Sequence, residues 1–425
     1  MPNAAVPVHQ TELLLSQVLL QLIVMIVAAR VLNTLFRRMG QPGAVGEIVA
    51  GLLLGPSLLG HVLPGLSASL FTVGAAPAIK ILSQIGLILL MFQIGCGFEF
   101  GRLGAARLKR LTLATAVVSL AVPFALGLGI GVLSAPRLAP GIDATAYALF
   151  CGVALSITAV PILGRILIER GLAQTDLGVV AISAAAINDV VGWLMLAAVS
   201  AYAAATLTGG GLALRLAMLV LFMLVLRFVL RPLVDRLVAR IPLTDGQLSP
   251  DLLATMLCLA FALALCTWAL GIFAIFGGFA AGLLFHHHRA VVAAWDAQVG
   301  RLVLVLFLPI FFTYTGLHTN LLGLTGSDWG WMLLVLAAAV LGKIVPVFLA
   351  ARALGEPPRP AMTLAALMNT RALMELIVLD AGRSLGVIPP AMFTMLVVMA
   401  VATTLMTGPL LTWLLPRTHR VMVAA

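Results

Sequence analysis

Two adjacent polar residues, Asn188 and Asp189, stand in the middle of the apolar run AISAAAINDVVGWLMLA. An aspartate at the centre of a membrane helix costs at least about 2.5–3.5 kcal/mol, and such residues mark ion and proton pathways. The small residues 183–186 leave room for close helix packing or for an aqueous approach. We expect Asp189 to bind a proton and a cation, with Asn188 beside it. A protonated Asp189 that only hydrogen-bonds another helix is the structural alternative.

A second run, ALSITAVPILGRIL, carries Ser156, Thr158 and Pro161 at about mid-span. Proline removes a backbone donor and disfavours helix in the residue before it. In a bilayer, freed backbone groups survive only where they line a cavity or a site. We therefore expect an interrupted helix here, with Ser156 and Thr158 near a bound cation. A simple proline kink is the alternative.

A third run, LAALMNTRALMELIVLDAG, places Asn369, Thr370, Arg371 and Glu375 where a membrane helix should be apolar. Arg371 and Glu375 are four residues apart and can neutralise each other on one helix face. The run is either an ordinary helix with a buried ion pair or a second interrupted helix. The second interpretation is favoured by the matching position of this run in the second half of the chain.

Lys343 lies deep in the run AAAVLGKIVPVFLA and requires a negative partner. Asp189 or the negative C-terminal ends of the interrupted helices would supply one. With Arg371 and Glu375, Lys343 forms the charge-compensating set that we expect around the cation site.

The other polar residues offer weaker signals. Glu47 lies near a helix start, and His286, His287 and His288 end an apolar run, where a solvated helix end or a metal or pH-sensing role is expected. The four cysteines lack a C-x-x-C spacing and are expected to be packed thiols. Because the sequence carries no nucleophile–base pair, phosphate-binding loop or metal-ligand cluster, we expect no enzyme, no cofactor and no metal beyond a transported monovalent cation.

The composition indicates whether these residues are surrounded by water or by lipid. Of the 425 residues, 62% are hydrophobic and 9% are charged, against about 25% charged in soluble domains. Apolar stretches of about 18 residues or more recur along the chain, and each can cross a bilayer as a helix. The basic residues lie in short loops between these stretches, which argues against nucleic-acid binding. The chain is therefore expected to be an all-α polytopic membrane protein.

About thirteen transmembrane helices are expected, with the first retained in the mature protein. Their ranges are 12–36, 43–60, 77–98, 109–134, 144–168, 177–206, 212–238, 250–270, 272–287, 299–320, 329–353, 360–382 and 389–415.

The basic residues divide unequally between the two sides of this arrangement. One side would carry 19 of the 25, and the other would carry only Lys80, Arg137, Arg215 and Arg383. The positive-inside rule makes the rich side cytoplasmic, so we expect a bacterial inner-membrane protein with its N-terminus outside and its C-terminus inside.

The predicted second and ninth helices are both short and glycine-rich, and both contain Ala-Gly-Leu-Leu, at 50–53 and 281–284. Seven helices separate them, so equivalent segments would cross in opposite directions. This predicts an inverted repeat of helices 1–6 against 8–13, with helix 7 as the connector. The chain would form a single membrane domain over 1–425, without a C-terminal regulatory domain.

These motifs together resemble one transporter family. ALSITAVPILGRIL, SAAAINDVVGW and MNTRALMELIVL, with GEIVAGLLLGPSLLG and GIFAIFGGFAAGLL, are similar to segments of the Kef-type monovalent cation/proton antiporters (cation/proton antiporter-2), closest to the branch with the plant cation/H⁺ exchangers. The resemblance runs from about residue 12 to 415. It implies a sodium/proton antiporter-like fold with interrupted helices 5 and 12.

The resemblance also implies a homodimer with moving parts. Its scaffold would comprise the helices at about 12–98 and 250–320, its transport core those at about 109–206 and 329–415, and the helix at 212–238 would link them. Asp189 would be the exchanged carboxylate, Thr158 would lie where helices 5 and 12 cross, and Lys343 would be the core lysine. Asn188 departs from the paired acids of many electrogenic relatives, which favours electroneutral exchange of K⁺ or Na⁺ for H⁺.

Three other functions remain open at this point. A proton-coupled exporter of an organic cation or metabolite is compatible with the motifs, because the width of the central pocket cannot be read from them. A cation channel would need charged rings or a repeated selectivity filter. An intramembrane enzyme would need a partner acid or metal beside Asp189.

Overall fold

The computed structural model describes residues 8–41, 43–72, 74–97, 106–158, 160–172, 175–208, 212–241, 243, 246–270, 274–371 and 373–415. Within these residues the regular elements are helices. Arg102, Arg417 and Arg420, which belong to the predicted cytoplasmic basic set, lie outside the described residues, and so do the side chains of Pro161 and Arg165.

Nine helical segments among the described residues are long and apolar enough to cross a membrane. Seven of them are α1 (Val8–Arg38), α5 (Ala76–Cys96), α6 (Ala106–Leu138), α9 (Asp176–Thr208), α12 (Pro250–Ala269), α16 (Gly326–Ala353) and α19 (Pro390–Leu414). The other two are Val45–Val62 and Val303–Gly323. The chain is therefore a helical, multi-pass membrane protein.

The remaining predicted spans fall on shorter helices. They are α7 (Ala144–Ser156) and α8 (Val160–Glu169); α10 (Leu212–Val225), η1 (Leu226–Leu230) and α11 (Arg231–Arg240); α13 (Ala274–Phe285); and α17 (Pro358–Met368) and α18 (Leu373–Ser384). The total of thirteen spans stays a prediction.

The structure corrects two of the predicted boundaries. The span expected over 43–60 falls on the segment Val45–Val62 but is not one continuous helix, because α2 (Gly43–Leu54) is followed by the short helices α3 (Leu59–Val62) and α4 (Pro64–Leu70). Pro56 lacks a backbone donor, and a Cβ on Gly55 would lie 2.3 Å from the carbonyl oxygen of Gly316, so the chain turns where another helix approaches it closely.

The helix expected over 299–320 begins about ten residues earlier than predicted. The helical path runs through α14 (Arg289–Trp295), η2 (Asp296–Gly300), η3 (Val303–Phe307) and α15 (Leu308–Leu317). Its polar start looked like a loop in the sequence. In the fold, however, Trp295 is buried against Phe92, with ring centroids 4.6 Å apart, and Asp296 hydrogen-bonds the Gln93 side chain of α5.

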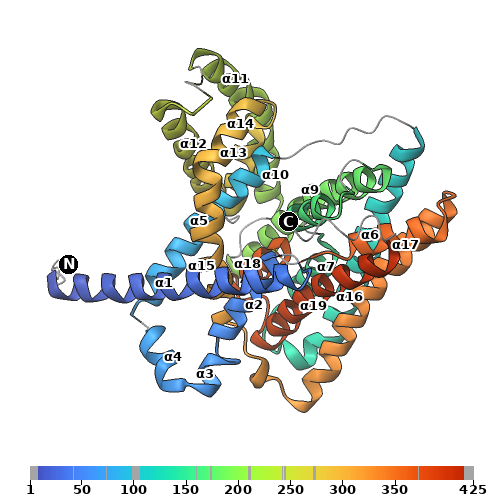
Figure 1. The fold of residues 1–425 in the computed structure, drawn as a ribbon, viewed down its shortest axis with the longest axis horizontal. Coiled ribbons are helices and arrows are strands. Elements are labelled where there is room, and N and C mark those ends of the chain that lie inside the picture. The colour runs from blue at the N-terminus through green and yellow to red at the C-terminus, as the bar shows by residue number, and fades with distance from the viewer. Residues whose placement is uncertain are drawn as a thin grey trace.

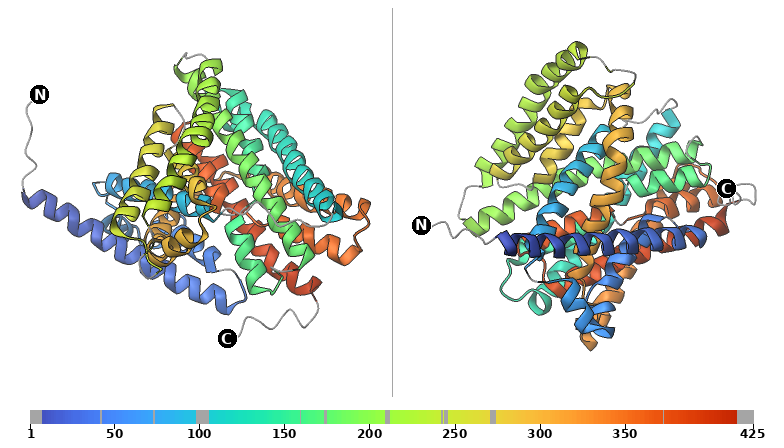
Figure 2. Two further views of the ribbon diagram at one scale, coloured as in Figure 1. Left: turned by 90° about the horizontal axis from the view of Figure 1, so that it is seen from above. Right: turned by 60° about the vertical axis from the view of Figure 1, so that its left-hand side comes forward.

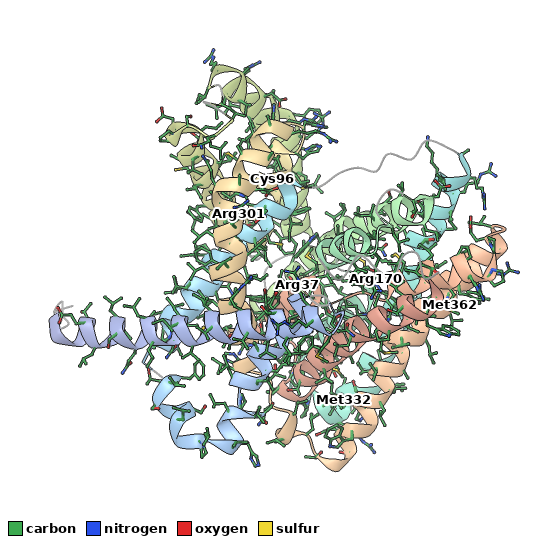
Figure 3. All side chains as sticks on the ribbon, in the orientation of Figure 1. Arg37, Cys96, Arg170, Arg301, Met332 and Met362 are labelled. Atoms are coloured by element: carbon green, nitrogen blue, oxygen red, sulfur yellow. The ribbon has the colours of Figure 1, made fainter. Side chains whose placement is uncertain are left out.

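The helices form two packed groups (Figure 1). In one group α1 packs on α2, α2 on α15, and α13 lies between α5 and α12. In the other, α6 contacts α7, α9 and α16, while α16 and α19 contact α17. Two further views show α1 extending across one side of the molecule (Figure 2). Among the residues labelled in Figure 3, Cys96 and Arg301 lie in the first group, and Met332 and Met362 lie in the second.

Glycines allow the helices of the first group to approach closely. A Cβ on Gly282 of α13 would lie 2.1 Å from the carbonyl oxygen of Phe92, and a Cβ on Gly95 of α5 would lie 2.3 Å from that of Phe279. Backbone atoms cannot move aside as a flexible side chain can. The contact between α5 and α13 therefore depends on both glycines.

Replacement of Gly282 by alanine should separate α5 from α13. We expect Gly282→Ala to lower stability by about 1–3 kcal/mol, the range for inserting a methyl group into a well-packed core. The measurement is the midpoint of thermal unfolding of the purified protein. The matched control is Gly129→Ala in α6, an exposed helical glycine whose added Cβ would meet nothing within 4 Å. Equal midpoints for the two variants would contradict the prediction.

Candidate functional site

The site begins with the gap between α7 and α8. Helix α7 ends at Ser156, Ile157 is extended with φ −68° and ψ 145°, and α8 begins at Val160. Pro161 is the second residue of α8, where a helix tolerates proline because the missing backbone donor would have no partner within the helix. The last carbonyl groups of α7 lack partners within the helix and need donors from elsewhere.

Two cationic side chains from other helices bind this end of α7. The Nζ of Lys343 donates to the carbonyl oxygen of Ile157 at 2.9 Å and to the hydroxyl of Thr158. The Nη1 of Arg371 donates to the carbonyl oxygen of Ala154 at 3.2 Å. Lys343 and Arg371 are both fully buried. They place positive charge where the helix dipole is negative, which is the favourable arrangement.

The second gap lies between Met368 at the end of α17 and Leu373 at the start of α18. Helix α19 accepts hydrogen bonds from two polar groups of this gap. The Nδ2 of Asn369 donates to the carbonyl oxygen of Thr403 at 3.3 Å, and the backbone N–H of Arg371 donates to the Thr404 hydroxyl at 3.2 Å. The Arg371 guanidinium also donates to the carbonyl oxygen of Ala339 in α16, at 3.3 Å. Arg371 thereby connects three helices.

Four ionisable side chains gather around these gaps. Nη1 of Arg371 lies 3.7 Å from Oε2 of Glu375, and both side chains are fully buried. Lys343 interacts electrostatically with Glu375, with Arg371 and with Asp189. Two cations and two acids therefore share one dry region. Such a balance is needed because an unpaired charge in a membrane interior is costly.

Asp189 lies near the middle of α9 and is only 2% exposed. The start of α8, at the backbone N–H of Val160, and the ammonium of Lys343 face its carboxyl group. Neither carboxyl oxygen makes a hydrogen bond with geometry that meets ordinary limits in the part of the chain that the structure describes. Both oxygens thus keep their capacity to take up a proton or to ligate a cation.

Asn188 and Ser156 have other partners. The Nδ2 of Asn188 donates to the hydroxyl of Ser119 in α6 at 2.7 Å, which ties α9 to α6. The hydroxyl of Ser156 donates to the carbonyl oxygen of Val153 in its own helix at 2.8 Å. Ser119 could not be predicted as a partner from the sequence, because a lone serine in an apolar helix carries no distinctive signal.

The structure thus brings Thr158, Lys343, Arg371, Glu375 and Asp189 into one linked set. The weaker candidates lie elsewhere. Glu47 accepts from Nδ2 of Asn33 at 2.6 Å and lies 3.6 Å from Arg30, so it joins α2 to α1. His288 lies 2.8 Å from Asp235 of α11. No cluster of metal-ligating side chains is found among the described residues.

A polar contact between the two helix groups was also missed. The Nε2 of Gln84 in α5 donates to Oδ2 of Asp380 in α18 at 3.1 Å, and the Arg383 guanidinium donates to the Tyr314 hydroxyl of α15 at 3.1 Å. Asp380 is 5% exposed. The sequence does indicate that Asp380 needs a polar partner, because it stands in the apolar stretch LIVLDAG. Its partners, however, lie on distant segments.

Comparison with known proteins places this chain in a family. Residues 22–417 match the family described as sodium/hydrogen exchanger, transmembrane. The chain is 37% identical over 413 residues to the Na⁺/H⁺ antiporter NhaS4 of Synechocystis, covering 94% of this chain and 97% of that protein. It is 35% identical to the cation/H⁺ antiporter 18 of Arabidopsis thaliana, covering 92% of this chain and 48% of the relative.

Two further matches cover most of this chain. The K⁺/H⁺ antiporter 1 of Saccharomyces cerevisiae is 29% identical, over 95% of this chain and 47% of the relative. This chain therefore spans about half the length of its plant and yeast relatives. The structure of the sodium/proton antiporter MjNhaP1 of Methanocaldococcus jannaschii matches with a TM-score of 0.65 at 16% identity, covering 93% of this chain and 99% of that one.

The match to MjNhaP1 shows a common fold. The family match, which covers nearly the whole chain, and the extent of the likeness to NhaS4 lead to one conclusion. This chain belongs to the sodium/hydrogen exchanger family.

Proposed function

We propose that this protein is a secondary antiporter that exchanges a monovalent cation, K⁺ or Na⁺, for H⁺, with Asp189 as the exchanging carboxylate. The observation that carries the proposal is the Asp189 side chain, which is buried mid-helix and faces the backbone N–H of Val160, while neither of its oxygens has a hydrogen-bond partner that meets ordinary geometric limits in the described chain. A structural aspartate would be expected to use those oxygens in bonds across helices. The named activities of NhaS4 and of the yeast relative support the same exchange and leave the cation open.

The residues at the α7–α8 and α17–α18 gaps would form the surroundings of Asp189 without binding the transported cation themselves. Lys343 and Arg371 bind the carbonyl end of α7, and Glu375 pairs with Arg371. These groups are therefore engaged with one another. Asp189 alone would then alternate between a bound proton and a bound cation, while the start of α8 and Lys343 hold the local field constant.

Alternating access would follow from the division into two helix groups. In this proposal α6–α9 and α16–α19 form the transport core, α1–α5 and α12–α15 form the scaffold, and α10–α11 links them. The contacts between the groups support it, because many are polar or aromatic rather than glycine-mediated, such as Gln84 with Asp380 and Trp193 with Phe276. Polar contacts can be remade as one body slides on another. The resemblance to dimeric antiporters supports a homodimer, and the distribution of basic residues supports an inner-membrane location.

The direct test is exchange in proteoliposomes with an imposed proton gradient. Addition of K⁺, Na⁺ or Li⁺ in turn, followed by candidate organic cations, should dissipate the gradient for at least one monovalent metal ion. The rate should saturate with cation concentration, as carrier flux does. A response to organic cations alone would reassign the substrate, and unsaturable current without proton coupling would indicate a channel.

Asp189→Asn should abolish exchange, to the level of protein-free liposomes, while the protein still folds. Asparagine preserves the shape of the side chain but cannot release a proton at any working pH. The measurement is proton flux on cation addition, with thermal unfolding as the check on folding. Asp251→Asn, at an exposed helix start, is the matched control and should exchange normally. Retained flux in Asp189→Asn would move the exchanging group elsewhere, with Glu375 as the next candidate.

Lys343→Gln should lower the thermal unfolding midpoint and slow exchange, yet leave some exchange detectable. The glutamine amide can still donate to the Ile157 carbonyl, but it no longer supplies charge to the end of α7. Lys80→Gln, an exposed lysine of α5, controls for loss of one positive charge. If exchange vanished in a stably folded Lys343→Gln protein, lysine would be part of the coupling itself.

Exchange should be electroneutral, with one proton for one monovalent cation. Asp189 has the amide Asn188 beside it, and the two cations and Glu375 are already engaged, so each half-cycle moves the same net charge. A second carried proton would add about 2.3 kcal/mol per 100 mV of membrane potential to the driving force. We expect exchange rates that do not change when vesicle potential is clamped at different values with an ionophore. A rate that follows the potential would refute the charge count.

A further inference from the structure

A cavity lies between α9, the helical path α10–α11, α12 and α13. Its volume is about 370 Å³, within the range of ligand pockets. Val190 and Trp193 of α9 line it together with Phe276 and Phe279 of α13. The ring of Trp193 meets that of Phe276 edge-on, with centroids 5.2 Å apart. The walls are therefore largely apolar and aromatic.

One end of this cavity is basic. Arg227 and Arg231 line it, and Arg227 belongs to the π-helical segment η1, a distortion that often occurs at functional sites. Arg227 is exposed and Arg231 is half-buried. Neither arginine has a carboxylate partner within the described residues. An apolar cavity with two uncompensated cations at one end complements an amphiphile with a negative head.

The helix that carries the arginines sets their depth in the bilayer. Helix α10 begins at Leu212, and about 20 helical residues cross the hydrocarbon core, which brings Arg231 to the opposite interface. Arg227 lies one turn before it, and a long arginine side chain reaches the same interface by extending along the helix. The predicted topology makes this the cytoplasmic side. Both guanidinium groups then lie at the level of inner-leaflet headgroups.

The cavity also opens towards the surroundings of the protein. Leu194 and Met223 on its lining are 46% and 43% exposed. Around a membrane-spanning helix those surroundings are lipid chains. Arg227 and Arg231 are the two arginines of the lining, and His286 lies beside them. The positive charge of the site is therefore supplied by the two arginines.

We propose that this cavity is a binding site for an anionic phospholipid of the inner leaflet. The phosphate headgroup lies between Arg227 and Arg231, and an acyl chain follows the apolar wall past Phe279 to Trp193. Binding of the proton and of the cation at Asp189 uses none of these residues. The site belongs to the class of basic pockets between membrane helices that hold lipid headgroups.

A lipid in this position contacts both helix groups. It lies on α9, which carries Asp189, and on α13, which packs against α5. Occupancy therefore changes how easily α9 moves relative to α13. This effect on exchange rate rests on the proposed function, whereas lipid binding itself does not.

Native mass spectrometry of the delipidated protein tests the site directly. The probes are phosphatidylglycerol and phosphatidylcholine with the same acyl chains, and we expect the protein to retain phosphatidylglycerol preferentially. The double variant Arg227→Gln/Arg231→Gln should bind it about 25-fold more weakly, since each basic residue near the headgroups contributes about fivefold. The control Arg236→Gln/Arg240→Gln removes the same charge from exposed positions of α11 and should bind normally.

Two further arms separate the lipid from a simple anion and from a folding defect. Glycerophosphoglycerol, the headgroup without chains, and inorganic phosphate should not displace the lipid, because the apolar wall supplies much of the affinity. Arg231→Lys keeps the charge and should bind within a few fold of wild type. Equal retention of both lipids, equal loss in the control pair, or displacement by phosphate would each overturn the proposal. Because the readout is binding, a protein that binds lipid yet exchanges no cations would refute only the proposed function.

Discussion

The site depends on two buried cations that bind the carbonyl end of α7. A helix that stops inside a membrane exposes carbonyl groups that water cannot reach, and each unsatisfied group costs several kcal/mol. Lys343 from α16 and Arg371 from the α17–α18 gap satisfy two of them with charge-assisted hydrogen bonds. The cations in turn need the negative helix end, because neither could remain charged in an apolar interior alone. The break and the cations therefore stabilise each other.

Because the two cations are bound at the end of α7, the carboxyl oxygens of Asp189 are not needed to neutralise them. Glu375 lies within 3.7 Å of Arg371, and Lys343 is held by Ile157 and Thr158. The positive start of α8, at Val160, faces Asp189 instead of a side-chain donor. A backbone dipole offers a fixed field and transfers no proton. The carboxyl group is thus placed in a prepared environment while its oxygens stay available.

The contacts between α5 and α13, within the first helix group, differ in kind from the contacts between the two groups. Where α5 meets α13, glycines bring backbones together, and a methyl group would collide with a carbonyl oxygen. Such contacts have one low-energy geometry and hold helices rigidly. Between the groups the contacts are side-chain hydrogen bonds and ring contacts, such as Arg383 with Tyr314. Contacts of this kind restrict the relative position of two helices less than a backbone contact does.

The lipid environment, the all-helical class and the buried charges that need an explanation can be read from the sequence. Only 9% of the residues are charged, so each ionisable residue in an apolar run stood out, and Asp189, Lys343, Arg371 and Glu375 could be named from their positions alone. Pro161 and the polar turn before Glu375 predicted interruptions in their helices, because their chemistry is local. The i,i+4 spacing of Arg371 and Glu375 was likewise a local relation.

Contacts between residues far apart in the sequence are seen only in the tertiary structure. That Lys343 binds the end of α7, that Asn188 binds Ser119, and that α14 continues into α15 without a loop could not be read from the chain. Hydrophobic periodicity reports which residues avoid water, and in a bilayer nearly all of them do, so it carries little information on which helix faces which. Contacts between helices depend on packing and on the need to satisfy buried polar groups, and both are properties of the assembled fold.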